Sequence, residues 1–255
     1  MTGRLLGLAL WTALVGAGCV TGRRGAVASV APAPRRLLFI GNSFTFYNGG
    51  IDQQVRLLAA SAHPPRLLDV DRATKGGATL RILHGLGWVH EKIQEGHPDL
   101  VILQDDIPEL KEHDVAPFRE HVRLFDAEIR RAGARSVLFM AWPYERLGWA
   151  TWEQIEAAHR EVGRELGIPV APVGRALRRA LEARPRLAML GADKEHETLH
   201  GTYLAAVVIH AVAFGADPRG LTYRPEGVTE DEAAFLRDIA WRTVREWASE
   251  GKGKG

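Results

Sequence analysis

The stretch that decides the fold is LLFIGNSFTFYN, residues 37–48. Four apolar residues at 37–40 run directly into a glycine, an amide and a hydroxyl, which are Gly41, Asn42 and Ser43. A short apolar run that ends in turn-forming residues is typical of a strand buried on both faces. In open α/β sheets, the residues that follow such strands lie where ligands bind. The stretch therefore predicts a buried strand with reactive side chains at its carboxyl end.

Similar apolar runs alternate with amphipathic segments along the rest of the chain. We expect strands at 37–40, 67–72, 100–103, 136–141 and 168–171. Apolar residues recur at helical spacing over 118–129, and Thr151 to Gln154 has the capping-box pattern at the start of a helix that continues to Leu166. Two more helices are expected near 203–214 and 236–244. The alternation predicts a three-layer α/β/α, flavodoxin-like sandwich around a parallel sheet of about five strands.

The composition fits one such domain. The chain has 255 residues, of which 46% are hydrophobic and 25% charged. The net charge of +2 comes from 33 basic and 31 acidic residues mixed along the sequence. The sequence has no stripe of basic residues of the kind that nucleic-acid-binding proteins need, so we expect no nucleic-acid partner. We expect the folded domain at 37–250, between a Gly-, Ala-, Pro- and Arg-rich tether at 20–36 and a disordered tail at 251–255.

The N-terminal segment has the features of an export signal. Arg4 precedes an apolar run at 5–15, which is shorter than the roughly 20 residues that span a bilayer. The following LVGAGC, ending at Cys19, resembles the lipobox of bacterial lipoproteins. This resemblance implies a signal peptide at 1–19, a lipid anchor on Cys19 and a place in the cell envelope. The alternative is an ordinary secretory signal that is cleaved near Ala17 or Ala28. Cys19 is the single cysteine, so disulfides are excluded.

Four loops that follow expected strands carry polar or small residues, and parallel strands bring such loops to one edge of the sheet. They are Gly41-Asn42-Ser43, Gly76-Gly77, Gln104-Asp105-Asp106 and Trp142-Pro143. A serine becomes a nucleophile when a histidine takes its proton and a carboxylate orients that histidine. Asp193 and His196, three residues apart, offer both groups. Donors to the oxyanion could come from the backbone of Ser43, from the backbone of Gly76 or Gly77, and from the side-chain amide of Gln104.

These residues together resemble the SGNH hydrolases, also called the GDSL esterases and lipases. Gly41-Asn42-Ser43-Phe44 stands in place of Gly-Asp-Ser-Leu, Gly77-Ala78-Thr79 resembles the glycine block, and Asp193-x-x-His196 matches the last block. The segments IGNSFTFYN, LVILQDD and HETLHGTYLAAVVIHAVAFG are similar to a bacterial branch with GNSFT near its start, and the resemblance covers 37–215. Gln104 replaces the usual asparagine of the third block, and Glu197 and Thr198 replace a proline and a serine.

The resemblance implies an ester hydrolase with an exposed site and no cofactor or metal. Ser43, His196 and Asp193 would be the catalytic triad, and Ser43, Gly77 and Gln104 the oxyanion hole. We expect Asn42, Gly76 and Trp142 to contact the substrate, a small-molecule or polysaccharide ester. Because the protein is expected outside the cytoplasm, removal of acetyl groups from carbohydrate is the favoured activity.

Two alternatives remain open. His196-Glu197-Thr198-Leu199-His200 spells H-E-x-x-H, which predicts a zinc metallopeptidase if both histidines lie one turn apart on a helix. Alternatively, the chain could be a non-catalytic, glycan-binding envelope lipoprotein of the same fold. Each candidate residue also has a structural explanation, since asparagine, serine and aspartate favour helix caps and turns.

Overall fold

The computed structural model describes residues 1–2 and 33–252. The expected signal peptide with Cys19, most of the tether and the last three residues lie outside the described part. Within it, no helix is both long and apolar enough to cross a membrane.

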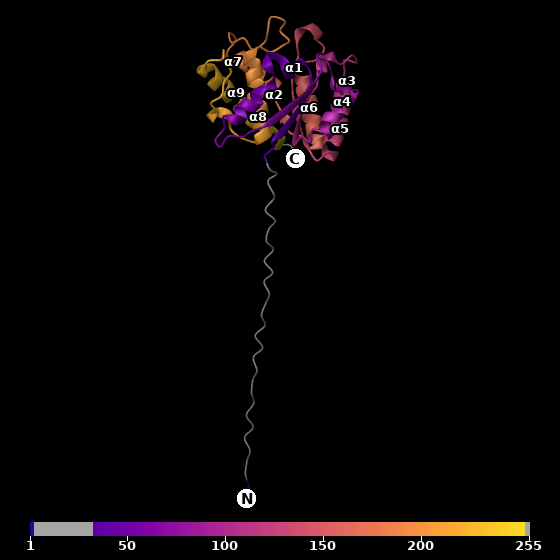
Figure 1. Ribbon diagram of the computed structural model, residues 1–255, viewed down its shortest axis with the longest axis vertical. Coiled ribbons are helices and arrows are strands. Elements are labelled where there is room, and N and C mark those ends of the chain that lie inside the picture. Colours follow the sequence, from indigo (N-terminus) through magenta and orange to yellow (C-terminus); the bar gives the residue numbers. More distant parts are fainter. Residues whose placement is uncertain (3–32, 253–255) are drawn as a thin grey trace. The chain divides into compact units, whose positions relative to one another are not determined.

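The centre of the fold is a parallel sheet of five strands (Figure 1). Its strands, given in chain order, are β1 (Arg36–Gly41), β2 (Asp69–Thr74), β3 (Leu100–Gln104), β4 (Arg135–Phe139) and β5 (Val170–Ala171). In space they run β2-β1-β3-β4-β5, the strand order of flavodoxin-like folds. The predicted sheet is confirmed, although β2 begins two residues later than expected and β5 is only two residues long.

Helices cover both faces of the sheet because successive strand residues point to opposite sides. Leu37 and Phe39 pack on one face, and Leu38 and Ile40 on the other. The first face is covered by α1 (Ser43–Phe46), α2 (Ile51–Ala60), α7 (Val173–Ala183), α8 (Leu199–Phe214) and α9 (Glu230–Lys252). The second face is covered by α3 (Leu80–His84), α4 (Gly87–Gln94), α5 (Ala116–Arg131) and α6 (Trp152–Leu166). The predicted three-layer α/β/α architecture is therefore confirmed.

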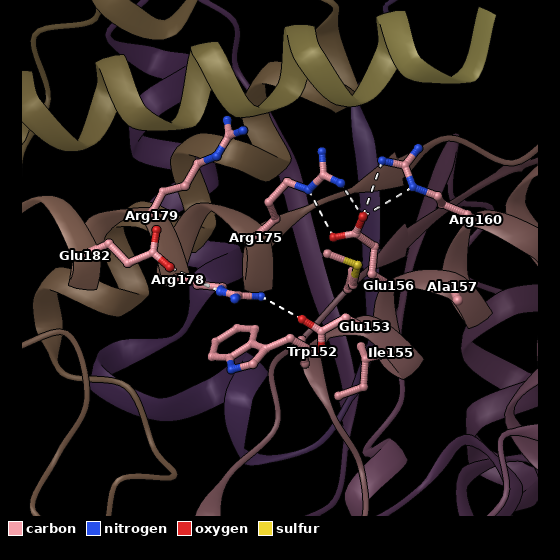
Figure 2. Close-up of a pocket in the computed structure, with 12 residues that line it drawn as sticks. Trp152, Glu153, Ile155, Glu156, Ala157, Arg160, Arg175, Arg178, Arg179 and Glu182 are labelled. Carbon is pink, nitrogen blue, oxygen red and sulfur yellow. Dashed lines mark hydrogen bonds and ion pairs between the residues drawn. The ribbon is translucent and has the colours of Figure 1, made fainter. Parts of the chain in front are cut away.

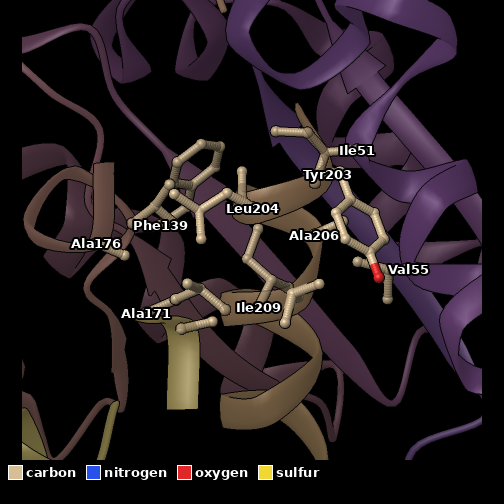
Figure 3. Close-up of a cluster of buried hydrophobic side chains, with 14 of the residues drawn as sticks. Ile51, Val55, Phe139, Ala171, Ala176, Tyr203, Leu204, Ala206 and Ile209 are labelled. Atoms are coloured by element: carbon tan, nitrogen blue, oxygen red, sulfur yellow. The ribbon is translucent and has the colours of Figure 1, made fainter. Parts of the chain in front are cut away.

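Helix α8 lies at the centre of the first layer, and every residue from Gly201 to Ala211 is buried. Figure 3 shows Leu204 and Ile209 of this helix among side chains of α2, β4, β5 and α7. A helix that is apolar on all sides is stable in water only when it is enclosed in this way. The position of α8 matters for the site because the loop that enters it carries Asp193 and His196.

The capping box predicted at Thr151 is confirmed. The Thr151 hydroxyl accepts a hydrogen bond from the Gln154 backbone N–H, and the Gln154 side chain accepts one from the Thr151 N–H. Helix α6 therefore begins at Trp152, immediately after the capping residue.

Candidate active site

Ser43 lies at the carboxyl end of β1, where the chain turns sharply into α1. Gly41 has no room for a side chain, because a Cβ there would lie 2.5 Å from Gln104 Oε1 and 2.6 Å from Thr45 Oγ1. The Asn42 side chain caps α1 by accepting a hydrogen bond from the Phe44 N–H at 3.0 Å. This tight turn exposes part of Ser43 while its neighbours Asn42 and Phe44 are buried.

The structure brings Ser43 together with the histidine and aspartate that enter α8. His196 Nε2 lies 2.9 Å from Ser43 Oγ, and His196 Nδ1 lies 2.9 Å from Asp193 Oδ2. With the ring proton on Nδ1, the imidazole donates to Asp193 and can accept the serine proton through Nε2. These three hydrogen-bonded side chains thus have the geometry of a nucleophile (Ser43), a general base (His196) and an orienting carboxylate (Asp193).

Asp193 is held as a carboxylate by donors that surround it. Its hydrogen bond to the His196 ring and those from the backbone N–H groups of Glu195 and His196 lower its pKa below the ordinary value. The Asp193 side chain is half exposed, whereas the His196 side chain is 21% exposed. The triad therefore opens directly to solvent.

Side chains from the segment after β4 fix the loop that carries Asp193 and His196. Trp142 Nε1 donates to the Glu195 carbonyl at 2.9 Å, and Arg146 forms an ion pair with the Glu195 carboxylate. Lys194 pairs with Glu145 on the same side. These contacts hold the imidazole over Ser43.

A buried polar network lies behind the serine. Asn42 Nδ2 donates to Asp106 Oδ2 at 2.6 Å, and the Tyr144 hydroxyl donates to Asp106 Oδ1 at 2.9 Å. Asp105 accepts from the backbone N–H groups of Leu80 and Asp106. Burial is the main cause that raises the pKa of Asp106 to about 7 and that of Asp105 to about 6. The network links β3 to the loops that carry Ser43 and Gly77.

Two of the expected oxyanion donors have suitable surroundings. Ser43 is the first residue of α1, and N–H groups at a helix start have no intrahelical acceptor. Gly77 is exposed in the loop after β2, the strand beside β1, and its φ of +62° is a conformation that glycine adopts freely.

Gln104 does not fit the expected third donor. Its side chain is fully buried, its Oε1 accepts from the Asn42 N–H at 2.8 Å, and its Nε2 donates to the Asp105 carbonyl at 2.9 Å. The longer glutamine side chain folds back onto the backbone and fixes the turn before Ser43. This geometry corrects the expectation that the Gln104 amide faces a bound ester.

Two of the three expected substrate contacts are corrected for the same reason. Asn42 is fully buried and Trp142 is only 1% exposed, so both position the site instead of facing a substrate. Gly76 is exposed beside Gly77, as a substrate contact requires.

The aromatic residue that does face solvent at the site is Tyr47. Its ring stacks on His196 with centroids 4.3 Å apart, and the residue is 41% exposed. Its place four residues after Ser43, beyond the short helix α1, was the only sequence signal for this role.

The H-E-x-x-H pattern does not form a zincin site. Helix α8 begins at Leu199, so His196 lies in the preceding loop and His200 in the first turn. Both ring nitrogens of His196 already contact Ser43 and Asp193, whereas His200 faces Glu232 at 3.3 Å. Glu197 is buried, which would prevent it from activating a water molecule.

A cavity of about 530 Å³ lies between α6 and α7, and no triad residue lines it (Figure 2). Arginines dominate its wall, but they are already paired with carboxylates. Arg178 pairs with Glu153, Arg179 pairs with Glu246, and Arg160 and Arg175 both pair with Glu156 and Glu250. The cavity therefore presents no unneutralised positive charge and gives no reason to place the active site there.

No protein-family model and no curated protein matches the sequence. Solved structures do share its fold. A candidate SGNH hydrolase from Slackia heliotrinireducens matches with a TM-score of 0.57 and 21% identity, over 70% of this chain and 98% of its own. A catalytic variant of an acetylxylan esterase from Geobacillus stearothermophilus matches with a TM-score of 0.59 and 18% identity, over 74% of this chain and 97% of its own. The lipase/acylhydrolase of Enterococcus faecalis matches with a TM-score of 0.58 and 20% identity, over 75% of this chain and 99% of its own. The chain therefore has the fold of the SGNH hydrolases.

Proposed function

We propose that the protein is an exported serine esterase that hydrolyses carboxylic esters through Ser43, His196 and Asp193. The observation that carries the proposal is the continuous hydrogen-bonded chain from Ser43 Oγ through the His196 ring to the Asp193 carboxylate. These residues come from opposite ends of the domain, and the hydrogen bond between Ser43 and His196 spans 153 positions of sequence. Helix capping explains neither that contact nor the orientation of the ring.

In the proposed reaction, His196 Nε2 takes the Ser43 proton while Oγ attacks the acyl carbonyl carbon. The backbone N–H groups of Ser43 and Gly77 stabilise the resulting oxyanion, and such donors contribute about 10²- to 10³-fold each to the rate. The intermediate collapses as His196 returns the proton to the departing alcohol, which leaves an acyl group on Ser43. Water, deprotonated by His196, then releases the acid and restores the serine.

Acetylated carbohydrate is the proposed substrate class. The half-exposed Asp193 and the exposed Tyr47 fit an open site that can accept part of a polymer, and an exposed aromatic ring can stack on a sugar. One of the proteins with the same fold is an acetylxylan esterase. Export through the N-terminal signal, with a lipid anchor on Cys19, would bring the enzyme to such polymers.

The test is hydrolysis of p-nitrophenyl acetate by the wild type and by Ser43→Ala, with and without a chelator. Ser249→Ala, at an exposed serine of α9, is the matched control. We expect Ser43→Ala to lose about 10⁴-fold or more in kcat, while the control and the chelated wild type keep their activity. Activity that survives in Ser43→Ala would contradict the triad. A wild type that turns over none of a panel of esters, yet binds acetylated xylan, would support the glycan-binding alternative.

Substrate and location need separate measurements. Release of acetate from acetylated xylan, compared with release of longer acyl chains from synthetic esters, tests the acyl preference. Loss of membrane association and of radiolabelled palmitate in Cys19→Ala tests the lipid anchor.

A further inference from the structure

Three side chains that take no part in the triad gather on the second face of the sheet. His84 ends α3, His90 lies in α4, and Glu128 lies in α5. Each offers a ligand atom, and these atoms all lie within 4.8 Å of one another. Helices α3, α4 and α5 run together at one side of the molecule (Figure 1). The cluster therefore joins three separate helices.

The spacing is close to that of a metal centre. Nitrogen and oxygen ligands about 2.0–2.2 Å from a tetrahedral zinc ion lie roughly 3.3 Å apart. His90 Nδ1 and Glu128 Oε2 are 2.7 Å apart, and the largest separation in the cluster is 4.8 Å or less. An ion between them would replace the present hydrogen bond, and modest side-chain rotation would bring the three atoms to coordination distance.

The surroundings also orient two of the three ligands, His90 and Glu128, as metal sites require. His90 Nε2 lies 2.7 Å from the His84 carbonyl oxygen, so the ring can keep its Nε2 proton on that carbonyl while Nδ1 gives up the hydrogen bond to Glu128 and offers its lone pair to an ion. The second carboxylate oxygen of Glu128 accepts a hydrogen bond from Gln94 Nε2 at 3.3 Å. Metal-binding histidines almost always donate their other N–H to a carbonyl or carboxylate, and metal-binding carboxylates are held by further hydrogen bonds.

The hydrogen bond between His90 and Glu128 does not involve the ring nitrogens of His84. The His84 ring meets the rings of His90 and Phe125 edge-on, with centroids 4.9 and 5.1 Å apart. Among the described residues it makes no hydrogen bond. Its two nitrogens are therefore available, in a partly buried place next to a carboxylate.

We propose that His84, His90 and Glu128 bind one divalent transition-metal ion of the zinc class, with water completing the coordination. Imidazole nitrogens and a carboxylate oxygen suit zinc and its neighbours better than they suit calcium or magnesium, which prefer oxygen ligands. The ion cross-links α3, α4 and α5 and stabilises that layer. This proposal is independent of the esterase proposal, because none of the three ligands belongs to the triad.

The test uses the full chain purified without a polyhistidine tag. Equilibrium dialysis against zinc, followed by elemental analysis, should give one ion per chain, and a fluorescent chelator in competition gives the Kd. Cobalt in place of zinc should give the visible absorption bands of a four-coordinate site. Thermal unfolding should shift to higher temperature with zinc, since a ligand that binds only the folded state stabilises it.

Glu128→Gln and His84→Asn each remove one ligand while keeping a polar side chain of similar shape, and Gln94→Ala removes only the supporting hydrogen bond. We expect the ligand variants to weaken binding by more than about 100-fold and Gln94→Ala by about 10-fold. His97→Asn is the matched control, because His97 is an exposed histidine whose φ of 44° suits asparagine. Absence of stoichiometric zinc in the wild type, or equal affinity in the ligand variants and the control, would overturn the proposal.

Discussion

Asp193 shows how much of this site depends on the direction of one hydrogen bond. Its carboxylate accepts a hydrogen bond from the His196 Nδ1–H, and so Nε2 faces Ser43 without a proton. The same carboxylate accepts two backbone N–H groups, which keep it ionised and fix the loop. One residue therefore sets both the tautomer and the position of the proposed general base.

We predict that Asp193→Asn lowers kcat on p-nitrophenyl acetate by about 10³- to 10⁴-fold. The asparagine amide can donate to Nδ1, which would move the ring proton to Nε2 and prevent it from accepting the serine proton. KM should change little, because asparagine has nearly the size and shape of aspartate. The matched control is Asp217→Asn, since Asp217 accepts a backbone N–H two residues ahead as Asp193 does but lies outside the site. A loss below tenfold would show that Asp193 does not orient the histidine.

At the scale of elements, helix starts and strand ends position the site. The turn from β1 into α1 places Ser43, and the loop that enters α8 places His196, while Trp142 and Arg146 after β4 hold that loop from the side. Helix α6 plays a supporting part, because its capping box fixes where the segment after β4 ends and the helix begins.

We predict that Thr151→Ala lowers the free energy of unfolding by about 1 kcal/mol, because it removes the acceptor for the Gln154 N–H. Esterase activity should be retained, since the cap touches no triad residue. Urea unfolding monitored by circular dichroism measures the change. Thr222→Ala, at an exposed threonine outside the helices, is the control and should stay within about 0.5 kcal/mol of the wild type. Equal stability of the two variants would mean that the box contributes nothing.

At the scale of the whole molecule, three buried acids couple the stability of the fold to pH. Burial is the first cause of the raised pKa in each of them: about 6 for Asp105, about 7 for Asp106 and about 8 for Glu197. In the unfolded chain the same groups ionise near 4. At a pH between the unfolded and the folded pKa of such an acid, the folded protein keeps a proton that the unfolded chain has released. Through these three groups, rising pH therefore favours unfolding.

We predict that the free energy of unfolding falls as pH rises from about 6.5 to about 8, and that Glu197→Gln makes this fall less steep. Below about 6.5 the buried His159 and His210, whose pKa burial lowers to about 4, oppose the acids. Each buried acid can contribute up to about 1.4 kcal/mol per pH unit within its own window. Glutamine has nearly the shape of the protonated acid and never ionises. Urea unfolding of both proteins across this pH range measures the two slopes, and identical slopes would show that Glu197 is not protonated in the fold.

The amino-acid sequence by itself determined the strands, their order along the chain and several of the helices. The apolar runs predicted all five strands, the T-x-x-Q pattern at Thr151 predicted the start of α6, and the spacing of Asp193 and His196 predicted their contact. These features are local: a period, a cap or a gap of three residues depends only on neighbouring residues and on backbone geometry.

Only the tertiary structure decided which side chains of the candidate site face solvent and which are covered. Gln104 and Trp142 follow strands at the expected edge, yet packing buries both, whereas Tyr47 remains exposed over His196. The cluster of His84, His90 and Glu128 likewise forms because three separate helices pack together. The direction of a side chain at a strand end, and its access to solvent, depend on segments that are far away in the sequence. A local sequence pattern therefore cannot predict either property.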